Sequence, residues 1–222
     1  RIVEREPTLC AKVLQLANSA FFGLPRAVSN VSQAATYLGT LALRDLSLAM
    51  ETMASLQSGR VALSAENYRA FQTNALAVGM LGRRWFGTDR RKADDAFVAG
   101  MLRDMGHLVL ATRRSDSGPV DVEQHAALSA YLLGLWGIPH AVLEMVAFHE
   151  HPERVEHDGL EVVDIVHLAD ALVSQLAPSP FQAPPTCDFE RLAARGLTPA
   201  KLTELEAGAR EVLAQAKELL AQ

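Results

Sequence analysis

The stretch Ala99–Leu110, AGMLRDMGHLVL, carries the most information about the fold of this chain. It begins as an apolar helix and then places Arg103, Asp104 and His107 among methionines and leucines. A buried charge is costly unless an opposite charge or hydrogen bonds compensate it. We therefore expect Arg103 and Asp104 to end a buried helix inside a polar cluster. We expect Gly106 to allow a bend before a short helix at 107–112.

Helical periodicity continues on both sides of this stretch, and no run of alternating β-branched residues indicates a strand. The predicted fold class is all-α, a multi-helix bundle with an N-terminal helical subdomain packed on a second helical domain. Pro7 suits a first helical turn, Gly39 ends a helix, and a third helix follows at 41–50. Further helices are expected at about 66–85, 94–102, 121–136, from 139 to 151, at 161–177, and from Thr198-Pro199 onward.

The chain divides into three predicted parts. Residues 1–60 form the N-terminal helical subdomain, with a weak joint at Ser58-Gly59. Residues 61–177 form the second helical domain. Residues 178–222 hold a proline-rich loop and the C-terminal helices.

Composition limits the function classes. The 222 residues are 49% hydrophobic and 21% charged, with a formal net charge of −5, which favours a soluble globule and gives no support to nucleic-acid binding. The densest basic run, 90–92 (RRK), is expected in a solvated turn between helices. No apolar stretch approaches the length of a membrane span. Cys10 and Cys187 match no metal or redox spacing and fit a reducing cytoplasm.

Histidines and carboxylates recur at the ends and in the middle of apolar helices. Neutral imidazoles and carboxylates are natural ligands of zinc, manganese and iron, and residues from several helices can converge inside a bundle. A lone histidine at a helix end is more often a cap or a surface residue, so the spacing alone leaves both interpretations open. The candidates are Asp104, His125, His149 and Asp170.

Several segments together resemble a known family. Ala99–Leu110 resembles the motif that names the HD superfamily of metal-dependent phosphohydrolases. Residues 6–20 (EPTLCAKVLQLANSA), 31–39 (VSQAATYLG), 125–139 (HAALSAYLLGLWGIP) and 149–152 (HEHP) resemble the HDOD family, a relative of those enzymes. The resemblance runs from about Glu6 to Ala177. It implies bacterial signal transduction and an HD-like fold for residues 61–177.

The resemblance also shows where this chain departs from an active HD site. Such a site uses an early histidine, a His-Asp pair, further histidines and a late aspartate. Here the early histidine falls near 71–74, with Thr73 the best match. Arg103 replaces the histidine of the pair, and Glu150 replaces the second histidine of a later His-His step. The retained positions are Asp104, His125, His149 and Asp170.

Arginine cannot coordinate a cation, because its guanidinium stays protonated and carries only donors. At about 4 Å and an effective dielectric near 20 it repels a divalent cation by roughly 8 kcal/mol. We therefore interpret Arg103 as a structural substitute for the ion, paired with Asp104 or Asp170, and expect no cofactor. Two alternatives remain for Asp104, His125 and His149: a hydrogen-bonded polar cluster, which is favoured, or a residual site for one divalent metal.

Three functions follow as hypotheses. The first is a non-catalytic signal-transduction output or protein-interaction module, with protein partners or fused signalling domains. The second is a metal-dependent phosphohydrolase or cyclic-di-nucleotide phosphodiesterase. The third is a nucleotide sensor without turnover, which the surplus of acidic groups disfavours.

Overall fold

The computed structural model describes residues 64–112, 124–135 and 138–221. The chain divides into two compact units, Arg1–Arg60 with Ala221–Gln222, and Val61–Leu220. The described helices belong to the second unit, apart from the last residue of the final helix. The helices expected before residue 60 and the capping role of Asp121 lie outside the described residues. The three-part division of the chain stays a prediction.

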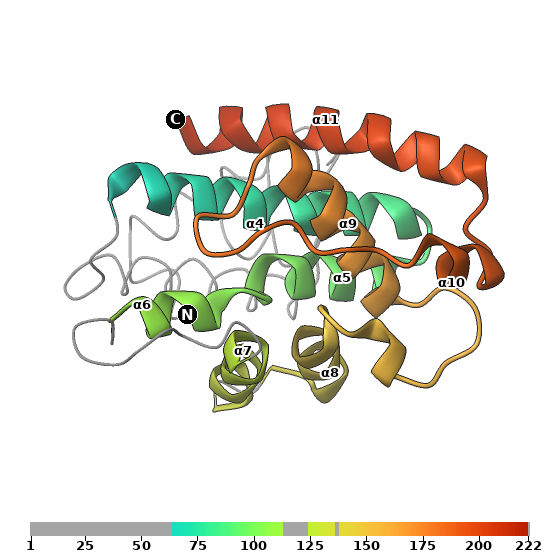
Figure 1. Cartoon of the computed structure of the whole chain (residues 1–222), viewed down its shortest axis with the longest axis horizontal. Helices are drawn as coiled ribbons and strands as arrows, with labels where there is room; N and C mark the ends of the chain where they lie inside the picture. The colour runs from blue at the N-terminus through green and yellow to red at the C-terminus, as the bar shows by residue number, and fades with distance from the viewer. Residues whose placement is uncertain (1–63, 113–123, 136–137, 222) are drawn as a thin grey trace. The chain divides into compact units, whose positions relative to one another are not determined.

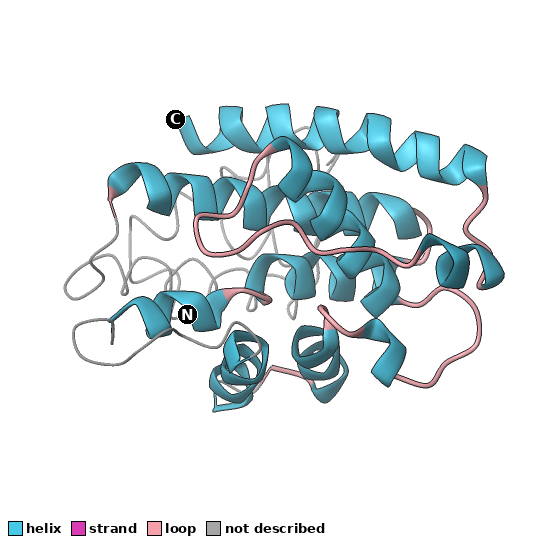
Figure 2. Ribbon diagram, in the orientation of Figure 1, coloured by secondary structure: helices cyan, strands magenta, loops and turns pink. Residues whose placement is uncertain are grey.

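Every regular element within these ranges is helical, which confirms the all-α fold class. Figure 1 shows the order of the helices, and Figure 2 shows the loops that join them. The elements are α4 (Ala65–Phe86), α5 (Arg90–Leu102), α6 (Met105–Thr112), α7 (Gln124–Leu135), α8 (His140–Phe148), the 3₁₀ helix η2 (Pro152–Arg154), α9 (Val162–Leu176), α10 (Phe189–Ala194) and α11 (Pro199–Ala221).

Helices α4 and α5 pack closely because both carry a glycine where they meet. A Cβ on Gly100 would lie 2.7 Å from the Cα of Gly79, and a Cβ on Gly79 would lie 2.7 Å from the carbonyl oxygen of Phe97. No side chain fits at this contact, so the two backbones approach directly. The approach brings the inner face of α4 to the end of α5, where Arg103 and Asp104 stand.

Helix α9 is the central element of this unit, and it packs against α4, α5 and α8. Its residues from Val162 to Ser174 are all buried. A capping box between Glu161 and Asp164 starts the helix. Asp164 also forms ion pairs with Nη2 of Arg191 at 2.9 Å and with Nη1 of Arg195 at 3.5 Å. These pairs link α10 and its C-cap residue to the first turn of α9.

Two sequence predictions about helix ends need correction. Helix α5 begins at Arg90 rather than 94, because the side chain of Asp89 caps it by accepting from the backbone N–H of Lys92. The basic run 90–92 is therefore the first helical turn, not a turn between helices. The bend before α6 lies at Arg103-Asp104, and Gly106 is already helical.

Gly106 has a packing role instead. A Cβ there would lie 2.2 Å from the carbonyl oxygen of His125, so α6 and α7 meet backbone to backbone at this point. The N–H of Gly106 donates to the hydroxyl of Ser129 at 2.7 Å, and this hydroxyl donates to the carbonyl oxygen of His125 at 2.8 Å. The contact fixes where α7 presents His125.

Candidate functional site

Arg103 lies at the centre of the candidate site. It caps the C-terminus of α5, and its side chain turns back so that Nη1 donates to the carbonyl oxygen of Gly100 at 2.6 Å. A cation is favoured there, because the last carbonyls of a helix carry partial negative charge. The side chain is fully buried, with 0% of its surface exposed. It therefore depends on buried partners rather than on water.

Those partners include two carboxylates. Nη2 of Arg103 lies 2.9 Å from Oδ2 of Asp104 and 2.8 Å from Oδ1 of Asp170. Burial lowers the pKa of Arg103, but the charges of Asp104 and Asp170 outweigh it and raise that pKa above its ordinary value. The pairing expected from the sequence is thus present with both aspartates.

Asn74 is a further partner of the guanidinium, and the sequence analysis included it only within the range 71–74, with Thr73 as the best match. Its Oδ1 accepts from Nη2 of Arg103 at 2.5 Å, and its Nδ2 donates to the hydroxyl of Ser174 at 2.9 Å. That hydroxyl donates in turn to Oδ1 of Asp170 at 2.8 Å. Thr73, the residue predicted for this position, instead donates to the carbonyl oxygen of Arg69 in its own helix at 2.8 Å. Of these two adjacent residues, Asn74 therefore contacts the guanidinium, whereas the side chain of Thr73 bonds within its own helix.

Asp104 joins the two halves of the site, because its two oxygens face different partners. Oδ2 faces Arg103, whereas Oδ1 lies 3.3 Å from Nε2 of His125 and 3.5 Å from Nε2 of His149. Burial raises the pKa of Asp104, but the charge of Arg103 and the interactions with His125 and His149 overcome that effect. The pKa is held well below its ordinary value, so Asp104 is a carboxylate at neutral pH.

The two imidazoles form a triangle with Asp104. Nε2 of His125 lies 3.3 Å from Nε2 of His149, and both side chains are at least 99% buried. Nδ1 of His149 lies 2.8 Å from the carbonyl oxygen of Val146, so the hydrogen of a neutral ring sits on Nδ1 and Nε2 carries a lone pair. Two acceptor atoms, Oδ1 of Asp104 and Nε2 of His149, thus each lie 3.3 Å from Nε2 of His125, which can supply only one hydrogen.

Glu150 borders this triangle from the outer side. Its Oε1 lies 3.9 Å from Nε2 of His125, and its side chain is 19% exposed. Among the described residues, the groups whose ligand atoms lie close enough to share a metal ion include two that overlap at His125. These groups are Asp104 with His107 and His125, and His125 with His149 and Glu150.

His107 connects the site to a distant segment, which the sequence did not predict. Its ring stacks on His125, with centroids 3.9 Å apart, and on its other neighbour Phe181, with centroids 5.0 Å apart. Its Nε2 lies 3.0 Å from Oε1 of Gln182, which accepts the hydrogen of this nitrogen. Burial is the main reason why the pKa of His107 falls from 6.5 to about 4. His107 is therefore neutral at pH 7.

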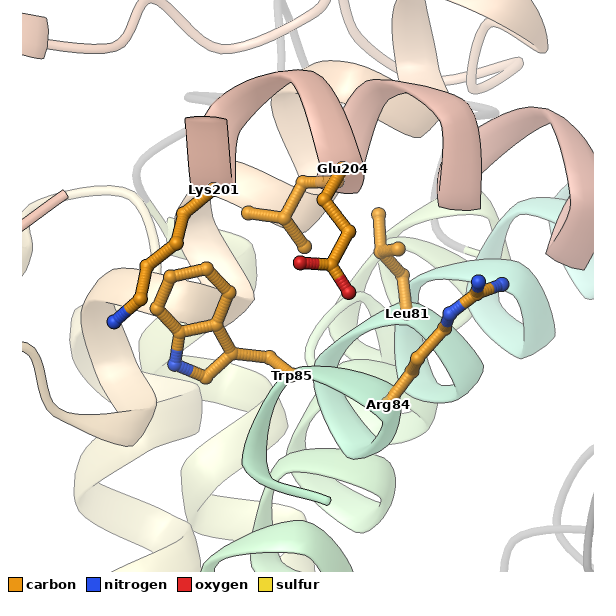
Figure 3. Close-up of a pocket in the computed structure, with 6 residues that line it drawn as sticks. Leu81, Arg84, Trp85, Lys201 and Glu204 are labelled. Atoms are coloured by element: carbon orange, nitrogen blue, oxygen red, sulfur yellow. The ribbon is translucent and has the colours of Figure 1, made fainter. Parts of the chain in front are cut away.

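A small pocket lies between α4 and α11, away from the candidate site. Figure 3 shows Trp85 and Lys201 side by side at one end and Glu204 reaching into the space. The pocket has a volume of about 150 Å³. Its cations already have partners, because Lys201 stands 5.1 Å over the ring of Trp85 and Arg84 pairs with Glu211. The small volume and the paired charges make it a packing feature of the two helices.

Comparison with known proteins identifies the family of this chain. The sequence profile of the HDOD domain matches residues 1–118, more than half of the chain and including Asn74, Arg103 and Asp104. The chain belongs to the HDOD domain family. The positions of His125, His149, Glu150 and Asp170 lie beyond the matched residues, so their assignment to the site stays with the structure and with the sequence resemblance.

Solved structures show that the HDOD fold is shared. An HDOD domain protein of unknown function from Geobacter sulfurreducens is 19% identical, with a TM-score of 0.66 over 98% of this chain and 84% of that one. A candidate signal transduction protein from Marinobacter aquaeolei VT8 is 20% identical, with a TM-score of 0.60 over 100% and 54%. A candidate phosphohydrolase from Shewanella amazonensis SB2B is 19% identical, with a TM-score of 0.60 over 96% and 84%.

A curated relative is much longer. An uncharacterized protein from Treponema pallidum (strain Nichols) is 22% identical over an alignment that covers 83% of this chain. The chain spans about 39% of the length of this relative. Within the described ranges, no helix combines the length and the apolar character needed to cross a lipid bilayer.

The buried charge network should control the stability of the HDOD fold. Replacing Arg103 by Met leaves two buried carboxylates without their cation, and we expect a loss of about 3–5 kcal/mol in the free energy of unfolding by urea. R91M is the matched control, because Arg91 is 86% exposed and 3.9 Å from Asp95, and it should cost less than about 0.5 kcal/mol. Adding D104N and D170N to R103M should recover stability. A loss of equal size in R91M would contradict this account.

His107 should make stability depend on pH. Its pKa is about 4 in the folded chain and near 6.5 when unfolded, so the unfolded state binds more protons between these values. Stability is then complete above pH 6.5 and falls as the pH drops toward 4, by up to about 3 kcal/mol. In H107F, which keeps an aromatic ring but cannot titrate, urea unfolding at several pH values should show a shallower decline. Equal declines in both proteins would refute the assignment.

Proposed function

We propose that this HDOD chain is a non-catalytic module of signal transduction. The observation that carries the proposal is the guanidinium of Arg103, which lies between Asp104, Asp170 and Asn74. In a metal-dependent phosphohydrolase this position holds an ion that lowers the pKa of a bound water and polarises the phosphoryl group. A guanidinium supplies positive charge but has no electron pair to accept a proton and no vacant position for water.

The charge balance supports the same proposal. Arg103 places a positive charge between the carboxylates of Asp104 and Asp170, and so supplies without an ion the kind of charge that a metal would bring to this position. A divalent cation close to the guanidinium would meet strong repulsion. The five side chains at the centre are also almost fully buried, which leaves a substrate phosphate little access. They are Arg103, Asp104, His125, His149 and Asp170.

The family and one neighbour point to the biological setting. The Marinobacter structure is that of a candidate signal transduction protein, and its fold is shared by this chain. Since the chain spans only part of its longer relative, we propose that it acts beside other domains or protein partners. In this role a change in conformation or in partner contacts, rather than turnover, would carry the signal. The Shewanella neighbour, a candidate phosphohydrolase, is the reason to test turnover directly.

The test is a phosphoesterase assay with the purified chain and with the full-length protein. Substrates are bis(p-nitrophenyl) phosphate and cyclic di-nucleotides, each with manganese, magnesium, zinc or iron(II). We expect the rates of the wild-type chain and of D104A to equal the rate without protein. Ion-dependent turnover that disappears in D104A would refute the non-catalytic proposal. Pull-down with the full-length protein then tests for partners.

A second candidate function is the binding of one divalent cation by Asp104, His125 and His149. Three ligand atoms about 2.0–2.2 Å from a common ion in tetrahedral geometry stand about 3.3–3.6 Å apart. The three separations observed are 3.3, 3.3 and 3.5 Å. Oδ1 of Asp104 is buried and has no hydrogen-bond partner among the described residues. The backbone bond to Nδ1 of His149 holds its ring in the orientation that ligand histidines use.

Charge also allows this ion. The carboxylates of Asp104, Asp170 and Glu150 outnumber the one guanidinium by two, and a divalent cation at the triangle would balance them. The residues present therefore fit a single metal, whereas the position of Arg103 does not. Such an ion would act as a Lewis acid toward a bound water or ligand. Asp104, His125 and His149 would hold it, and Glu150 would face it from the outer side.

Thermal unfolding with added zinc, manganese or iron(II) tests the second candidate. An ion that binds only the native state, at a free concentration of 100 times its Kd, raises the free energy of unfolding by about 2.7 kcal/mol. The Tm should therefore rise. H149Q should lose this rise, and H140Q, which changes an exposed histidine at the start of α8, should keep it. Metal analysis should give one ion per chain. No bound metal and no rise in Tm would exclude the cation and leave the non-catalytic proposal intact.

A further inference from the structure

Residues 177–187 connect α9 to α10 and are called the strap. The strap contains neither helix nor strand, and four of its residues are prolines: Pro178, Pro180, Pro184 and Pro185. Figure 2 shows it as an extended loop that passes along the helices. Within the described residues, no backbone–backbone hydrogen bond involves residues 178–187. The place of the strap is therefore set by contacts with the rest of the chain, not by structure of its own.

The strongest of these contacts are made to His107. The ring of Phe181 lies parallel to His107 at an angle of 8°, and its edge meets Phe71 at a centroid distance of 5.7 Å. The next residue, Gln182, accepts the hydrogen of His107 through Oε1 at 3.0 Å. Two adjacent strap residues thus contact one side chain of the site. His107 and Phe71 are only 5% and 2% exposed with the strap in this position.

Each end of the strap is tied to the site through a single backbone oxygen. The carbonyl of Ala177 accepts from Nδ2 of Asn74 at 3.0 Å, and Asn74 also binds Arg103. Near the other end, the carbonyl of Thr186 lies 3.3 Å from Nε2 of His167. Nδ1 of the same ring lies 2.8 Å from the carbonyl of His149. A neutral imidazole has one N–H, so it serves only one of these two carbonyls at a time.

We propose that the strap is a hinged closure over the site, latched on His107 by Phe181 and Gln182, which opens while the helices stay folded. Opening breaks few hydrogen bonds, and no helix has to unwind. The prolines keep the strap stiff, so it moves as one piece between the end of α9 and the start of α10. The ion pairs of Asp164 hold α10 in place during this movement. The closure acts in the same way whether or not the triangle holds an ion.

An open pocket lies beside the strap and gives it room. This pocket has a volume of about 390 Å³, and Pro185, Thr186, Glu150 and Glu153 are among the residues that line it. Glu150 is also the side chain that borders the triangle at His125. Release of Phe181 and Gln182 would extend the pocket toward His107 and His125. The strap therefore decides whether a solute reaches the site.

Cys187, at the end of the strap, provides a probe of opening. Cys187 is part-buried, and this burial raises the pKa of its thiol to about 12, so little thiolate is present at pH 8 while the strap is closed. An exposed cysteine has a pKa near 8.5 and reacts readily with a disulfide reagent. The chain has two cysteines, so C10S leaves Cys187 as the single thiol. The experiment follows the reaction of C10S with dithionitrobenzoate, in which the thiolate forms a mixed disulfide and releases thionitrobenzoate.

In the C10S background, F181A with Q182A should raise the rate of labelling at least about tenfold. H107A removes the other side of the same latch, and it should add little to the effect of the double variant. The matched control is F189A, which removes a 46% exposed phenylalanine two residues beyond Cys187 and should leave the rate unchanged. An unchanged rate in F181A with Q182A, or an equal rise in F189A, would overturn the latch.

The urea dependence of labelling in C10S alone separates local opening from global unfolding, and it needs no further variant. Opening of the strap exposes little surface, so the rate at low urea should hardly change with urea concentration. Labelling that follows the full urea dependence of global unfolding at every concentration would mean that the strap never opens alone, and the proposal would fail.

Discussion

The charge of one guanidinium, taken out of water and surrounded by carboxylates, is the constraint around which this domain is built. Ions of this kind are tolerated in a protein interior only when every partner is in place. Helix α4 supplies Asn74, α9 supplies Asp170, and the turn after α5 supplies Asp104, so the arrangement requires these three segments to meet. The glycine contact between α4 and α5 makes that meeting possible, since no side chain separates the two backbones there.

The sequence predicted most helices of this unit because their apolar periodicity is long and regular. It failed at short or charged elements. The start of α5 is hidden by the run RRKADD, whose charges resemble a loop, although Asp89 offered a capping signal. The six-residue α10 was missed for a similar reason, since its signal is little more than the N-cap Asp188. Gly106 was assigned to a bend because its contact with His125 is a matter of tertiary packing.

The site was partly accessible to the same reasoning. Arg103, Asp104, His125 and His149 all lie in recognisable segments, and the structure brings them together. Thr73 and Asn74 are adjacent and both buried, so only the rotation of α4 decides which of them faces Arg103. Phe181 and Gln182 could not have been found from sequence, because a proline-rich loop carries no signal of the side chain that it will contact. Residues that touch the site from a distance in sequence require coordinates.

Asp104 is shared between Arg103 and the two imidazoles, and this couples the two halves of the site. A carboxylate carries one negative charge, which its two oxygens share. A stronger interaction of Oδ1 with the imidazoles therefore weakens the interaction of Oδ2 with the guanidinium. A proton or a cation beside His125 would weaken the ion pair between Asp104 and Arg103. Because Asn74 contacts both Arg103 and the carbonyl of Ala177, the change would extend to the C-terminal end of α9. Binding at the imidazoles and pairing with the guanidinium are thus coupled through one carboxylate, and no covalent bond has to break.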